Sequence, residues 1–138
     1  MQLRIEYDTT IKDVQKEFNA LYPYLKIEFF ENSHLENNPG SKPSRISAKN
    51  VVAEVSKFNA SGSIDVDGKR TVWQLENDFR EAFGLLVQVF RKSANLWIET
   101  TLTDHWTLDK QNKEGEFLNQ QPSKSFEQKV EDGMIDAE

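Results

Sequence analysis

The chain has 138 residues, which fits one domain large enough to bury a hydrophobic core. It contains no cysteine, which excludes disulfides, thiolate metal sites and a cysteine nucleophile. No apolar run approaches the roughly 18 residues that span a membrane, and the N-terminus lacks an apolar signal-peptide core. We therefore expect a cytoplasmic protein that does not enter a membrane.

The formal net charge of −6 is unevenly distributed. Residues 113–138 hold seven acids and three lysines, a net −4, which leaves −2 for the rest of the chain. The composition of this acidic segment buries too little apolar area to offset the entropy lost on ordering. The sequence predicts one α+β domain over 1–112 and an acidic, mostly disordered tail over 113–138.

A strand, a helix and a second strand are predicted over residues 2–30. Apolar and polar residues alternate over 3–7 and again over 25–30, which is typical of strands. Between them, Thr10 is the expected helix N-cap and Pro23 ends the helix. The apolar face of this helix consists of Ile11, Val14, Phe18 and Leu21.

The same order of elements recurs over residues 63–91. Thr71 and Gln74 predict a capping box at the start of the second helix, and Gly84 ends it. The strongest matches between the copies are Leu3/Ile64, Ile5/Val66, Thr10/Thr71, Val14/Leu75 and Phe18/Phe79. The turn after the helix is one residue shorter in the second copy. The chain therefore contains a doubled βαβ unit, unless both halves merely obey the same local rules.

Three further elements complete the domain. Residues 31–46 are rich in turn formers and predict a loop, followed by a short helix that Ser47 caps and that reaches Phe58. A turn at Ser93 and Ala94 predicts a hairpin that pairs Phe90 with Trp97. This register directs Leu96, Ile98, Thr100 and Leu102 toward the core. A final short helix is expected from Leu108 to about Asn112, capped by Thr107.

These elements predict a two-layer α+β sandwich, a ferredoxin-like doubled βαβ unit with an extra hairpin strand and short helices. The alternative is a β-grasp-like arrangement of the second half. There, residues 83–90, the hairpin and Thr103-Asp-His-Trp106 resemble the ubiquitin-related PB1 interaction domains. The acidic cluster of those domains is absent, because Lys92, Ser93, Ala94 and Asn95 occupy the turn.

A broader resemblance covers most of residues 1–112. The stretch from Val87 to Asn112, together with Arg4-Ile-Glu-Tyr7 and residues 23–30, resembles a family of small uncharacterised bacterial α+β proteins. That resemblance implies no activity, cofactor or catalytic residue.

Neither of the two histidines is assigned a catalytic or metal-binding role. His34 falls in the polar loop with Glu31 and Glu36, where a solvated side chain is expected. His105 lies between Asp104 and Trp106 at a strand-to-helix junction, a candidate loop site. The same residues serve ordinary turn and capping chemistry, which is the favoured interpretation. The sequence has no glycine-rich phosphate loop, HExxH or GxSxG motif, so no cofactor, metal ligand or catalytic residue is assigned.

The face of the sheet away from the core is the strongest candidate surface. Alternation places three aromatic residues there, Phe30, Phe90 and Trp97, with Arg4 and Lys26 nearby. Aromatic side chains on the solvent side of a sheet call for a reason. The leading hypothesis is a non-catalytic interaction or assembly module, whose partner is a protein or another copy of the chain. The alternatives are single-stranded nucleic acid on the same face and a small enzyme or ligand site around Asp104 and His105.

Overall fold

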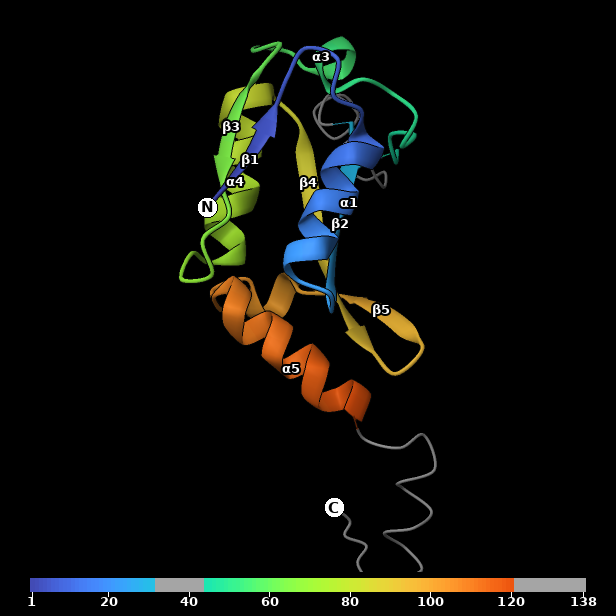
Figure 1. The fold of residues 1–138 in the computed structure, drawn as a ribbon, viewed down its shortest axis with the longest axis vertical. Coiled ribbons are helices and arrows are strands. Elements are labelled where there is room, and N and C mark those ends of the chain that lie inside the picture. The colour runs from blue at the N-terminus through green and yellow to red at the C-terminus, as the bar shows by residue number, and fades with distance from the viewer. Residues whose placement is uncertain (32–43, 121–138) are drawn as a thin grey trace, which may run out of the picture.

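The computed structural model describes residues 1–31 and 44–120 and confirms the α+β class (Figure 1). The strands are β1 (Gln2–Ile5), β2 (Leu25–Phe30), β3 (Gly62–Asp65), β4 (Leu86–Ser93) and β5 (Leu96–Glu99). The helices are α1 (Ile11–Leu21), α3 (Val52–Val55), α4 (Val72–Phe83) and α5 (Leu108–Gln120), with a 3₁₀ turn η1 (Thr101–Thr103). The β4–β5 hairpin projects from one end of the body, beside α5 (Figure 1).

The strands form two antiparallel sheets rather than the single sheet that we expected. β1 pairs with β3 in one, and the other has the order β2-β4-β5. Each βαβ copy therefore gives its first strand to one sheet and its second strand to the other. The finer ferredoxin-like and β-grasp-like predictions are not confirmed. Alternation fixes which face of a strand is buried, but it does not select the neighbouring strand.

Equivalent strands of the two copies pair with each other. Leu3 lies opposite Ile64, its counterpart in the second copy. Glu28 likewise lies opposite Gln88, its counterpart once the shorter turn before β4 is allowed for. An antiparallel pair in which a residue faces its own counterpart has a local two-fold axis through that pair. Both sheets meet this condition, so an approximate two-fold axis relates the two copies.

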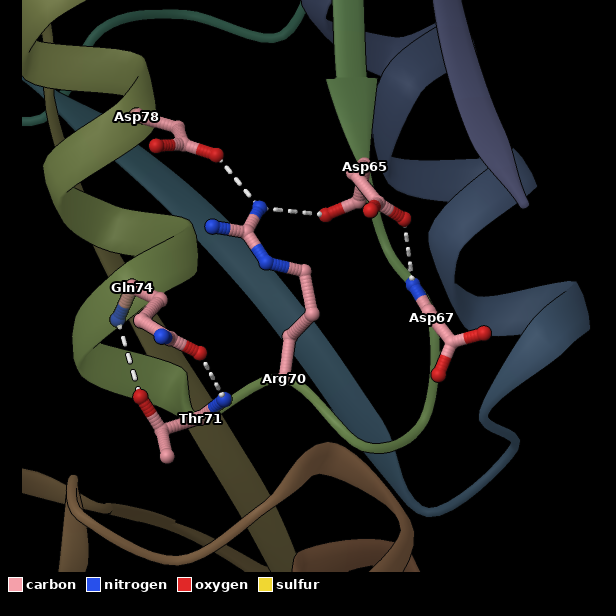
Figure 2. Close-up of polar contacts among 6 residues, drawn as sticks. All are labelled: Asp65, Asp67, Arg70, Thr71, Gln74 and Asp78. Atoms are coloured by element: carbon pink, nitrogen blue, oxygen red, sulfur yellow. Dashed lines mark hydrogen bonds and ion pairs between the residues drawn. The ribbon is translucent and has the colours of Figure 1, made fainter.

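Both long helices begin with a capping box. The Thr10 hydroxyl accepts from the N–H of Asp13, whose carboxylate accepts from the N–H of Thr10. These bonds hold the pKa of Asp13 below its usual range. Thr71 and Gln74 form the predicted box at α4 (Figure 2). α4 ends at Gly84, whose φ of 66° is the left-handed region that favours glycine.

One hydrophobic core joins the inner faces of both sheets to α1 and α4. Its largest side chains are Phe18, Phe29, Phe79 and Phe83, all fully buried. The Phe29 and Phe79 rings meet edge to face with their centroids 5.3 Å apart. The predicted apolar faces of both helices are confirmed except at Leu21, which lies exposed at the end of α1.

The predicted hairpin register is wrong by two positions. Phe90 lies opposite Glu99 and Trp97 opposite Lys92, because the turn is at Ala94 and Asn95. A shift of two keeps every side chain on its face, so alternation cannot exclude it. Thr100 is buried as expected. Leu96 is 68% exposed because it lies on the projecting hairpin, and Leu102 is 93% exposed because it lies in η1.

The helix boundaries outside the repeat also differ from the prediction. The helix expected from Ser47 to Phe58 is limited to α3, and the Ser47 hydroxyl accepts from Lys49 N–H instead. α5 continues to Gln120, well into the predicted disordered tail. α5 packs so closely against Tyr24 that a Cβ added at Gly115 would lie only 2.7 Å from the Cβ of Tyr24. This packing stabilises a helix that composition disfavours. Residues 121–138 lie outside the described part.

Candidate functional site

The outer sheet face is the solvent side of the β2-β4-β5 sheet. Its members are Lys26, Glu28, Phe30, Leu86, Gln88, Phe90, Lys92, Trp97 and Glu99, which alternate along their strands with residues of the opposite face. Three of the predicted site residues meet here. The Lys26 ammonium lies 5.4 Å from the Phe90 ring centroid and 5.2 Å from that of Trp97. These are cation–π distances, and they hold Trp97 over the sheet.

The other two predicted face residues lie apart from this cluster. Phe30 is at the far end of β2, where the Arg45 guanidinium lies 5.8 Å from its ring centroid. Arg4 is exposed on β1, in the other sheet, so the structure does not bring it to the outer sheet face. Phe90 is only 9% exposed, so its ring packs against neighbouring side chains and offers a partner little contact area.

Asp104, His105 and Trp106 form a loop that caps α4. The carbonyls of Asp104 and Trp106 accept from the N–H groups of Trp73 and Val72, two donors that a helix leaves unpaired. The Trp106 ring also has the Lys110 ammonium 4.3 Å from its centroid. Within the described ranges, the exposed His105 imidazole makes no hydrogen bond or ion pair. The geometry supports the structural interpretation of this loop.

The first half of the chain contains the same cap. The carbonyls of Asn50 and Ala48 accept from the N–H groups of Ile11 and Lys12 at the start of α1. Asn50 thus corresponds to Trp106, and Ala48 to Asp104, with the same spacing between the two carbonyls. The repeat therefore extends beyond 2–30 and 63–91 to a capping loop and the helix after it.

The α4 hollow opens beside the outer sheet face and has a volume of about 430 Å³. It is lined by Phe30, Glu76, Arg80, Leu86, Val87, Gln88 and Glu99. β5 is too short to pair with all of β4. The N–H of Val89 therefore donates to the carboxylate of Glu76, at 3.1 Å. Burial raises the pKa of Glu76 to about 7, and the charge of Asp104 acts in the same direction.

Sequence reasoning missed Glu76. A partly buried carboxyl with a raised pKa in a cavity is a recognised sign of a functional site, although structural groups show it too. Its only signal in the sequence is its place on α4, between the core residues Leu75 and Phe79.

The α1 hollow lies at the free edge of β2 and measures about 270 Å³. It is lined by Lys12, Gln15, Lys16, Asn19, Lys26, Ile27, Glu28 and Trp97. Gln15 donates to the Ile27 carbonyl at 2.9 Å, and Asn19 donates to the Leu25 carbonyl at 2.8 Å. These side chains satisfy backbone groups of the edge strand, as Glu76 does on β4.

The carboxylates of Asp65 and Asp67 serve the turn before α4 (Figure 2). Asp65 accepts from the N–H of Asp67, and Asp67 accepts from the N–H of Lys69. Arg70 donates to the Asp65 carbonyl and pairs with Asp78 on α4. This network fixes the turn and gives both acids a structural role.

Over residues 1–31 and 44–120, no group of three His, Cys, Asp or Glu side chains could hold a metal ion. In the same ranges, no helix has the length and apolar character needed to cross a membrane. His34 lies outside the described residues. No family model, curated protein or solved structure matches this chain.

Proposed function

We infer that this chain is a protein-binding module whose contact surface combines the outer sheet face with the free edge of β5. The observation that carries the inference is the composition of that edge. β5 is the last strand of its sheet, and three of its four residues, Leu96, Trp97 and Ile98, are apolar. Natural proteins protect free edges with charge, proline or bulges. β5 is short and ends in Glu99, but its other three side chains are apolar, which is typical of a surface that pairs with another chain.

Paired variants of the full chain test this function. The Leu96→Ser/Trp97→Ser double variant removes the apolar edge, and Tyr7→Ser is the matched control because Tyr7 is 74% exposed after β1. Each tagged chain is incubated with lysate of its source cells, and enriched proteins are quantified by mass spectrometry. We expect the wild type and the control to enrich the same partner and the double variant to lose it. Equal capture by all three chains, or a wild type that captures no partner, whether another protein or a further copy of this chain, would overturn the inference.

Single-stranded nucleic acid is the second candidate, favoured by Lys26 beside the Phe90 and Trp97 rings. It is the weaker candidate because residues 1–112 carry a net charge of −2, whereas such sites usually have a basic field. A fluorescence titration with a deoxythymidine oligonucleotide at low salt tests it. Absence of salt-dependent binding would remove this candidate.

A further inference from the structure

The two hollows occupy equivalent positions but carry opposite charge. The internal two-fold axis through the Glu28–Gln88 pair relates α1 to α4, so that Gln15 corresponds to Glu76 and Asn19 to Arg80. The α1 hollow has three lysines and one glutamate, a net +2. The α4 hollow has two glutamates and one arginine, a net −1 when both acids are ionised. One molecule thus presents both signs of charge on either side of a single sheet face.

Lys26 and Glu28 of the α1 hollow pair with each other, but several other charged groups around the two hollows have no ion-pair partner in the described residues. In residues 1–31 and 44–120, the ion pairs are Lys26–Glu28, Arg45–Glu28 and Arg70–Asp78. Lys12, Lys16 and Glu99 are exposed and have no ion-pair partner in those ranges. Their charges are therefore free to meet a partner.

We propose that the partner is a second copy of this chain, which lays its outer sheet face on this one so that the α1 hollow of each copy meets the α4 hollow of the other. The proposal rests on the inferred function, because it names the partner of that surface. A two-fold interface repeats every contact, so one complementary pair of patches provides two attractive contacts. Lys12 and Lys16 of one copy then approach Glu99 of the other, while Phe30, Leu86 and Trp97 supply apolar area between them.

A charge exchange tests the proposal with the full chain. The Lys12→Glu/Lys16→Glu variant changes the α1 hollow from +2 to −2. The Glu76→Gln/Glu99→Lys variant changes the α4 hollow from −1 to +2. The replaced lysines and Glu99 are exposed, and glutamine keeps an oxygen acceptor for the Val89 N–H, so both variants are expected to fold. Lys57→Glu/Lys69→Glu is the matched control, since both lysines are exposed and lie outside the hollows.

Sedimentation equilibrium at low salt and about pH 8, where Glu76 is mostly ionised, measures the result. We expect the wild type and the control to form a dimer that weakens as salt rises. Each exchanged variant alone should dimerise at least about tenfold more weakly, since like charges then face each other. An equimolar mixture of the two variants should recover the wild-type affinity, because each then offers the other two complementary contacts. Circular dichroism confirms that every variant is folded.

Three outcomes would overturn the proposal: a wild type that stays monomeric up to about 1 mM, folded variants that dimerise like the wild type, or a mixture that fails to recover. The inferred function is judged separately by the lysate capture. A monomeric wild type that still captures a partner through Leu96 and Trp97 would refute the second copy as partner and leave the binding surface in place.

Discussion

The raised pKa of Glu76 makes stability depend on pH in a predictable direction. Its pKa is about 7 in the folded chain, against 4.5 for an ordinary glutamate, mainly because burial penalises the charged form. The folded state therefore holds its proton to a higher pH than the unfolded state does. Stability from this group is present below about pH 4.5 and is lost as the pH rises through 7. The shift of about 2.5 units corresponds to roughly 3 kcal/mol at 1.36 kcal/mol per unit.

Glu76→Gln isolates this effect. Glutamine is nearly isosteric, cannot ionise and still offers an oxygen to the Val89 N–H, as the neutral acid does. At about pH 4 the variant and the wild type should have nearly equal free energies of unfolding. At about pH 8 the variant should be more stable by roughly 2–3 kcal/mol, because the wild type then buries a charge.

Urea unfolding followed by tryptophan fluorescence at about pH 4, 6 and 8 provides the measurement. The difference between the two chains cancels the titration of all other acids, which both chains share. A difference that does not change with pH would refute the reasoning. So would a variant less stable than the wild type at pH 8, since that would mean that the folded state favours ionised Glu76.

Three further predictions concern the packing and the caps. Phe90→Ala should lower the free energy of unfolding by about 3 kcal/mol, because Phe90 is only 9% exposed. Trp97→Ala should lower it clearly less, because Trp97 is more exposed. Equal losses for the two variants in urea unfolding would contradict the assigned burial. Thr71→Ala removes the hydroxyl that accepts the Gln74 N–H and should cost about 1 kcal/mol, whereas Thr71→Ser should keep most of the stability in the same assay. Gly84→Ala places a Cβ on a residue with a φ of 66° and 2.9 Å from the Cβ of Lys57. Its thermal unfolding midpoint should therefore fall by an amount equivalent to about 1–2 kcal/mol. An unchanged midpoint would show that the end of α4 relaxes without strain.

The local elements of the repeat follow from the sequence. Thr71, Gln74 and Gly84 mark the ends of α4 because capping and left-handed turns depend on neighbouring residues alone. The buried faces of the two long helices likewise follow from their periodicity. The meeting of Lys26, Phe90 and Trp97 on one sheet face follows from alternation, because a register shift of two residues leaves each side chain on the same face.

Contacts between distant segments depended on the tertiary structure. Alternation could not reveal that the strands divide into two sheets, that the hairpin turns at Ala94 and Asn95 rather than at Ser93 and Ala94, or that Arg4 lies away from the outer sheet face. Composition could not reveal that Tyr24 and α5 pack together and extend the helix to Gln120. The role of Glu76 is visible only in the folded structure, where β5 is too short to pair with Val89 and Glu76 accepts the Val89 N–H instead. Its raised pKa also depends on the fold, because several segments together create the burial that raises it. Local sequence therefore determined the two long helices of the repeat and their buried faces, whereas long-range packing decided the strand partners, the length of α5 and the charged hollows.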